Sequence, residues 1–167
     1  FIYSSILHEI YSYLSEASLK KLLRHTFEQT TSGGRIIIRD VVGPEEPDKE
    51  VFLELTMDDG VSTGEIEKLS TYAKFFKFAS DFLPRKIKFK EVAVEGKSLI
   101  KLRLQDAYEY ISKKNYIDNW SSEMHEEFGF YSFGRWCKEL EESGFTIVPG
   151  SHPFRNQHII ENSYKGK

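Results

Sequence analysis

Residues 31–40 read Thr-Ser-Gly-Gly-Arg-Ile-Ile-Ile-Arg-Asp and carry the clearest fold signal in the chain. A helical pattern runs into the Gly33-Gly34 pair, and a short apolar run that ends in charged residues follows it. This order is typical of a helix followed by a buried parallel strand whose carboxyl end opens onto a binding crevice. We therefore predict an α/β fold in which Arg35–Asp40 is a strand.

The residues before this stretch predict a second strand and a helix. Phe1–Leu7 is a short apolar run, and Ser18 can cap the helix that follows it. One inward stripe of that helix repeats at helical spacing and consists of Leu19, Leu22, Leu23, Thr26 and Phe27. Gly33 and Gly34 end the helix. Strand, helix and strand with such short connections predict a right-handed parallel crossover.

The remainder of the chain alternates turn-rich and periodic segments. Val41–Glu65 is acidic and rich in turn residues, and a helical pattern extends from near Glu65 to Leu83. We expect a hairpin of Ile87–Val94 and Leu99–Leu104, helices at Gln105–Lys114 and Phe133–Ser143, and strands at Phe145–Val148 and His158–Asn162. Asn115–Glu127 is ambiguous. Gly144 is expected to terminate the last helix.

Composition limits the class of protein. A length of 167 residues suits one domain, or one domain with a sizeable insertion. The net charge of −3 gives no general reason to expect binding to nucleic acid or to an anionic membrane. No apolar run approaches the roughly 18 residues of a membrane span. Cys137 is the single cysteine, which excludes an internal disulfide framework and predicts a cytoplasmic protein.

In their order and spacing these elements resemble the carboxyl-terminal half of class I S-adenosylmethionine-dependent methyltransferases. The matching segments are Ser4–Glu9 for the end of the family's fourth strand, Ser32–Asp40 for the fifth, Gly144–Val148 for the sixth and His158–Asn162 for the antiparallel seventh. The resemblance implies a partial Rossmann-like sheet, strands four to seven, formed by residues 1–42 and 131–167. Residues 43–130 would then be an α+β insertion on the substrate side.

The resemblance also implies a function. The parent protein would transfer a methyl group from S-adenosylmethionine to an O or N nucleophile of a small molecule or an RNA. The family's Gly-rich loop and ribose-binding acidic residue have no counterpart in these residues, so we expect a fragment that is inactive by itself. The alternative is a non-catalytic binding or scaffold module. A doubly wound reductase is disfavoured by the antiparallel last strand, and a homodimer is left open.

Candidate site residues lie where the first two predicted strands end. The resemblance places Ser4, Ser5 and Ile6 near the cofactor, whereas an ordinary strand end would use the serines as caps. His8 could act as a catalytic base because its pKa lies near working pH, although a histidine that caps or packs is the alternative. We expect Glu9 and Arg39 to bind substrate, Arg39 as a fork for a carboxylate or phosphate. An ion pair of Arg39 with Asp40 or another neighbour is the alternative.

A second group of candidates precedes the last predicted helix. Glu123–Tyr131 combines carboxylates, an imidazole and aromatic rings, and we expect His125 to be catalytic and Glu126 and Tyr131 to bind substrate. The Glu-x-His-Glu-Glu spacing does not put metal ligands on one helical face, so a pocket wall is preferred to a metal site. A basic strip, Arg85, Lys86, Lys88 and Lys90, is interpreted as a solvated strand face rather than a phosphate-binding one.

Overall fold

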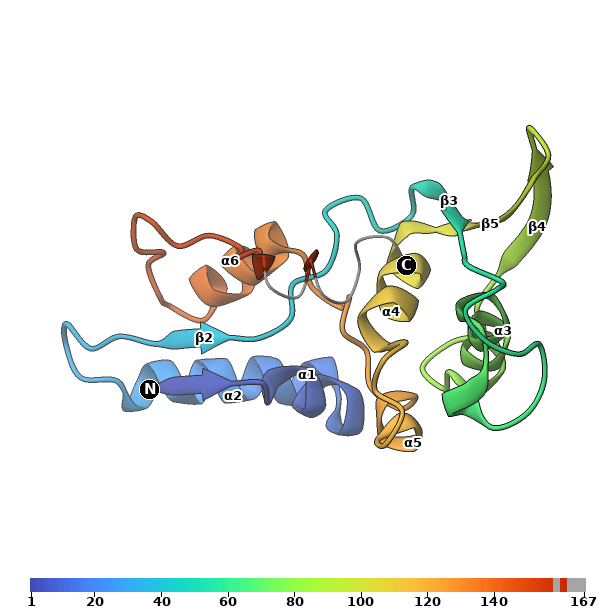
Figure 1. Ribbon diagram of the computed structural model, residues 1–167. Coiled ribbons are helices and arrows are strands. Elements are labelled where there is room, and N and C mark those ends of the chain that lie inside the picture. Colours follow the sequence, from blue (N-terminus) through green and yellow to red (C-terminus); the bar gives the residue numbers. More distant parts are fainter. Residues whose placement is uncertain (158–159, 162–167) are drawn as a thin grey trace. The chain divides into compact units, whose positions relative to one another are not determined.

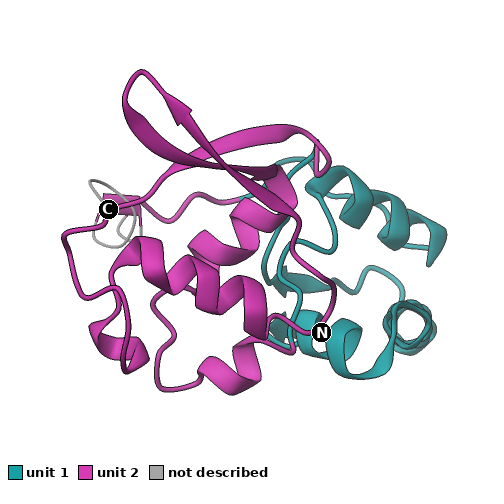
Figure 2. Cartoon of the chain, turned by 90° about the vertical axis from the view of Figure 1, so that its right-hand side faces the viewer, with its two compact units in different colours: residues 1–45, 126–153 teal, residues 46–125, 154–167 magenta. Residues whose placement is uncertain are grey.

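The computed structural model describes residues 1–157, 160 and 161, and the chain divides into two compact units. Unit 1 comprises residues 1–45 and 126–153, and unit 2 comprises residues 46–125 and 154–167 (Figure 2). The fold is mixed α/β. Apart from Ile160 and Glu161, the predicted last strand at His158–Asn162 lies outside the described residues. In residues 1–157, no helix combines the length and apolar character needed to cross a bilayer.

Unit 1 is built on a parallel strand–helix–strand unit. Its elements are β1 (Ile2–Ser4), α1 (Leu7–Glu9), the π-helical turn η1 (Ile10–Leu14), α2 (Glu16–Gln29), β2 (Ile37–Arg39) and α6 (Phe133–Glu142) (Figure 1). β1 pairs in parallel with β2, with Ile2 opposite Ile37 and Ser4 opposite Arg39. This confirms the predicted parallel pair. Both strands are shorter than predicted, and in the described part of unit 1 they form a sheet of two strands.

The core of unit 1 joins α2, α6 and the inner face of the two strands. Its buried members are Leu7, Leu19, Leu23, Tyr131 and Trp136, with Tyr3, Ile36 and Ile38 packed against them. The predicted stripe of α2 is therefore correct at Leu19, Leu23 and Thr26, which are buried, and Leu22 packs against the core. Phe27 is the exception, because it is 42% exposed. The fold of unit 1 thus depends on apolar side chains that are distant in the sequence.

The segment after α6 differs from the prediction. Gly144 ends the helix with a φ of 108°, and the N–H of Phe145 donates to the carbonyl of Leu140 at 3.0 Å. The expected strand at Phe145–Val148 is wrong, because these residues pair with no strand among those described. An apolar run becomes a strand only where a neighbouring strand offers hydrogen-bond partners.

The start of α2 also corrects the sequence analysis. Ser15, not Ser18, is the N-cap: its hydroxyl accepts the backbone N–H of Ser18 at 3.1 Å. The helix ends at Gln29, ahead of the Gly-Gly pair. We had placed the cap one turn too late because both residues are serines with the same capping chemistry.

Replacing Ser15 with alanine should lower the free energy of unfolding of unit 1 by about 1 kcal/mol, because an N–H of the first turn loses its acceptor. The Ser18→Ala variant is the matched control, since its backbone N–H remains and it should cost less. Hydrogen exchange of α2 peptides across a urea series would measure both. Equal losses in the two variants would contradict the assignment of Ser15 as the cap.

Unit 2 contains a three-stranded antiparallel sheet with the order β3-β5-β4. Its elements are β3 (Glu50–Glu54), the 3-10 turn η2 (Ile66–Lys68), α3 (Thr71–Asp81), β4 (Phe89–Val94), β5 (Lys97–Arg103), α4 (Leu104–Lys113) and α5 (Trp120–Glu123). The predicted hairpin and the helix after it are confirmed. β3 was missed, and the helix predicted from near Glu65 begins at Thr71, where the hydroxyl of Ser70 accepts the N–H of Ala73.

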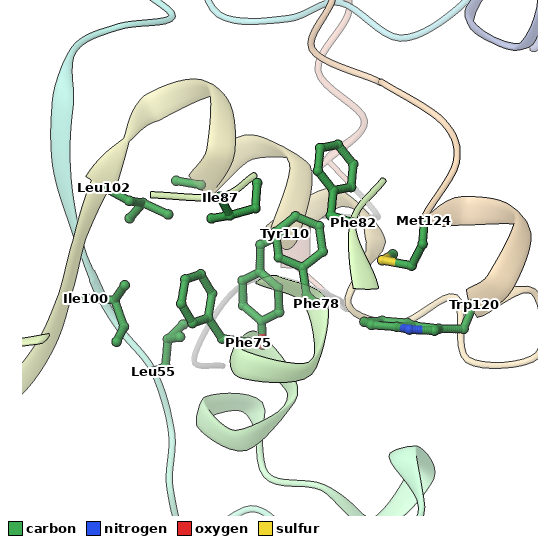
Figure 3. Close-up of a cluster of buried hydrophobic side chains, with 11 residues drawn as sticks. Leu55, Phe75, Phe78, Phe82, Ile87, Ile100, Leu102, Tyr110, Trp120 and Met124 are labelled. Atoms are coloured by element: carbon green, nitrogen blue, oxygen red, sulfur yellow. The ribbon is translucent and has the colours of Figure 1, made fainter. Parts of the chain in front are cut away.

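An aromatic cluster forms the core of unit 2 (Figure 3). Phe75, Phe78 and Tyr110 are fully buried, and their rings lie 5.2–6.4 Å apart between centroids. Ile100 and Leu102 of β5 pack against them. The aromatic residues of α3 therefore belong to the core of this unit.

Candidate functional site

The candidate site lies where β1 and β2 end. β1 ends at Ser4, and Ser5 turns the chain with a φ of 52°. α1 then begins at Leu7 and carries His8 as its second residue. Asp40 directly follows β2. Because parallel strands end at the same edge of their sheet, the two side chains meet, and Nδ1 of His8 lies 2.6 Å from Oδ1 of Asp40.

Asp40 is fixed by backbone donors as well as by His8. Its Oδ2 accepts the N–H groups of Leu7 at 2.7 Å and Ile6 at 3.1 Å, and its Oδ1 accepts that of Val41 at 2.8 Å. Burial alone would raise the pKa of the carboxyl, but the hydrogen bonds from His8 and the backbone outweigh burial and lower it. Asp40 is therefore an ionised carboxylate that ties the start of α1 to the end of β2.

Glu126 completes the cluster on the other side of His8. Its Oε2 lies 3.4 Å from Nε2 of His8, and the hydroxyl of Tyr13 donates to its Oε1 at 3.2 Å. The ring of Phe128 contacts the imidazole edge to face, with the centroids 5.1 Å apart. Both nitrogens of the buried His8 therefore face a carboxylate.

The segment that carries Glu126 is attached to β2 by backbone contacts. The N–H of Gly43 donates to the carbonyl of Tyr131 at 2.8 Å, and Gly43 forms a parallel bridge with Ser132. A Cβ at Gly43 would lie 2.6 Å from the carbonyl oxygen of Gly129, so only glycine permits this approach. This contact places residues 126–132 beside the end of β2.

The charge of His8 follows from these contacts. Burial favours the neutral imidazole, but the hydrogen bond and charge of Asp40, followed by the charges of Glu126 and Glu9, raise the pKa of His8 above 6.5. A protonated imidazole can donate to both carboxylates and has no lone pair with which to accept a proton. In this state His8 bridges and orients Asp40 and Glu126.

The other candidates at the strand ends are exposed. Arg39 donates to the hydroxyl of Ser4 at 3.0 Å. The binding of a substrate carboxylate or phosphate by Arg39 stays a prediction. Ser5 and Ile6 are also exposed beside the start of α1. These residues therefore lie at the same edge of the sheet as His8 and Glu126.

Two predicted residues lie elsewhere. Tyr131 is in the core of unit 1, where its hydroxyl donates to Glu16 at 2.8 Å and its ring packs on Arg135. His125 is an exposed residue of unit 2 whose Nδ1 lies 2.7 Å from the carbonyl of Ser121.

Sequence reasoning missed part of the cluster. We expected Asp40 only as an ion-pair partner of Arg39, whereas it is the main partner of His8. Its position directly after a predicted strand, like that of His8, is a signal that could have linked the two. Tyr13 and Phe128 gave no such signal, because their contact with the cluster depends on tertiary packing.

A pocket of about 370 Å³ lies beside β2 in the same unit. Its wall is mainly apolar and comes from β2 and its flanks, from α6 and from residues 147–152. Asp40 belongs to this wall, so the cluster and the pocket share one side chain. Among the described residues, no three His, Cys, Asp or Glu side chains are arranged to hold a metal ion.

Comparisons of the chain with protein-family models, with curated proteins and with solved structures find no match.

The titration of His8 offers a direct check on the cluster. Replacing Glu126 with glutamine should lower the pKa of His8, and Asp40→Asn should lower it further, because Asp40 contributes both a hydrogen bond and a charge. Proton NMR of the imidazole Cε1–H would follow the titration, with the remaining histidines as internal controls. An unchanged His8 titration in both variants would contradict the arrangement.

Proposed function

We propose that this chain is part of an S-adenosylmethionine-dependent methyltransferase and supplies the side of the domain that holds the methyl acceptor. The single observation that carries the proposal is the Asp40–His8–Glu126 cluster at the carboxyl ends of two parallel strands. In open α/β sheets, ligands bind at this edge. The strand–helix–strand order of β1, α2 and β2, which resembles the family's fourth and fifth strands, supports the same assignment.

The residues at this edge have the chemistry that such a reaction needs. S-adenosylmethionine, when bound, supplies a methyl group attached to a positively charged sulfur. The exposed hydroxyls of Ser4 and Ser5 and the apolar side chain of Ile6 fit one side of such a ligand. The chain would contribute positioning above all, because in-line displacement gains much of its rate from alignment.

Within this proposal His8 is a positioning residue. It holds the carboxylate of Glu126, which would accept the proton that an O or N nucleophile loses as its bond to the methyl carbon forms. The pKa of His8 is raised by the carboxylates around it, so we assign the proton acceptor to Glu126 rather than to the imidazole.

Calorimetric titration of S-adenosylhomocysteine tests the proposal. The titration compares this 167-residue chain with the product of the longest open reading frame that contains it. We expect no binding to the chain alone and binding to the longer product. Micromolar binding to the chain alone would contradict the expectation that these 167 residues do not bind the cofactor by themselves. Absence of binding to both proteins would overturn the methyltransferase assignment and favour a non-catalytic module.

A further inference from the structure

The sheet of unit 2 has one face packed on helices and one face open to solvent. Ile100 and Leu102 of β5 point into the core, so their neighbour Lys101 lies on the outer face. Lys101 pairs with Phe52 on one side and with Lys90 on the other. A row of one aromatic and two basic side chains therefore crosses the sheet.

Phe52 is the unusual member of this row. Its side chain is 54% exposed. Exposure of a phenylalanine ring is unfavourable, because burial of apolar surface stabilises a protein in proportion to the area removed from water. Nζ of Lys101 lies 6.0 Å from the centre of its ring. An exposed ring with a cation over it offers an aromatic surface and a positive charge in one place.

Basic residues outnumber acidic ones on and around this face. The cations are Lys88, Lys90, Lys97, Lys101 and Arg103, and the carboxylates are Asp48, Glu50 and Glu54. Ion pairs join Lys101 to Glu50 at 2.9 Å and Lys97 to Glu54 at 2.8 Å. Arg103 pairs with Asp48 at 3.0 Å and also with the buried Asp106 at 3.2 Å. Such exposed pairs are weak, so their lysines can exchange a carboxylate for a phosphate.

We propose that the outer face of the β3–β5–β4 sheet binds single-stranded nucleic acid, with Phe52 stacking on a base and Lys90 and Lys101 contacting phosphates. Unstacked bases pack on exposed aromatic rings, and phosphates attract the lysines beside them. A duplex keeps its bases stacked and offers none to Phe52. This inference rests on unit 2 alone and does not depend on the proposed methyltransferase function.

Fluorescence anisotropy with labelled oligouridylate and oligothymidylate of about twelve nucleotides tests the proposal on the full chain. We expect dissociation constants between about 10⁻⁶ and 10⁻⁴ M. Phe52→Ala should weaken binding about fivefold or more. The Lys90→Gln/Lys101→Gln double variant should reduce the salt dependence, with a slope smaller by about 1.4. Comparison of the two oligomers distinguishes RNA from DNA as the natural ligand.

Matched controls replace similar residues outside this face. Tyr116→Ala removes an exposed aromatic ring, and Lys68→Gln/Lys74→Gln removes two charges from η2 and α3; both should bind as the unmodified chain does. Circular dichroism checks that every variant is folded. The proposal is overturned if the unmodified chain does not bind, if Phe52→Ala binds equally well, or if a duplex or an acidic peptide binds as tightly.

Discussion

Replacing Phe78 with alanine should lower the free energy of unfolding of unit 2 by about 3–5 kcal/mol. The side chain is fully buried, and its ring contacts those of Phe75, Phe82 and Tyr110. Truncation removes apolar surface from the core and leaves a cavity that these rigid rings can fill only in part. A loss of this size is a large fraction of the stability of a typical domain.

Hydrogen exchange of α4 peptides across a urea series would measure the change in unit 2. Phe52→Ala is the matched control, because it makes the same chemical change at a ring that is 54% exposed, and it should cost much less. A loss below about 1 kcal/mol for Phe78→Ala would contradict the central place of this ring in the core.

The sequence predicted best where the local pattern and the tertiary packing agree. Three elements show this agreement: α3, the hairpin around Gly96 and α6. In each, apolar residues recur at the spacing of the positions that are buried. The parallel pair of β1 and β2 was predicted for a different reason, since short connections around a helix leave few other arrangements.

The failures come from partners that the local sequence does not contain. β3 lies in an acidic, turn-rich stretch and becomes a strand because β5 pairs with it along its whole length. Phe145–Val148 has a strand-like composition, but no described strand lies beside it. In both cases hydrogen-bond partners from a distant part of the chain decide the outcome.

The candidate site was predicted in the same uneven way. His8 and Glu126 were both named from the sequence, and the structure brings them together. The contact between His8 and Asp40 was not predicted, because it depends on where the ends of β1 and β2 meet. Tyr131 and His125 were chosen by composition alone, and composition does not distinguish a core aromatic residue or an exposed histidine from a site residue.

Replacing Asp40 with alanine should lower the free energy of unfolding of unit 1 by about 3–5 kcal/mol near pH 5. The change leaves the protonated His8 without its closest counter-charge and removes the acceptor of the Leu7 and Ile6 N–H groups. A buried charge or donor without a partner costs more than the original contact contributed. Asp40→Asn keeps an acceptor oxygen and should cost less.

The size of this loss should depend on pH, because the pKa values of both Asp40 and His8 differ between the folded and unfolded states. The pKa of Asp40 is lowered in the folded state, so its contribution is present above pH 3.8 and is lost as the pH falls through the folded pKa. The pKa of His8 is raised, so its contribution is present below pH 6.5 and is lost as the pH rises through the folded pKa. The difference between the unmodified chain and Asp40→Ala is therefore greatest between these two values.

Urea unfolding at a series of pH values, followed by hydrogen exchange of α2 peptides, would measure this difference. The expected curve has a maximum between pH 3.8 and 6.5 and declines on both sides. Asp81→Ala is a suitable control, because it removes a carboxylate of unit 2 that has no part in the cluster. A difference that stays constant from pH 5 to pH 9 would show that Asp40 acts only through its backbone hydrogen bonds, and that His8 carries no charge in the cluster.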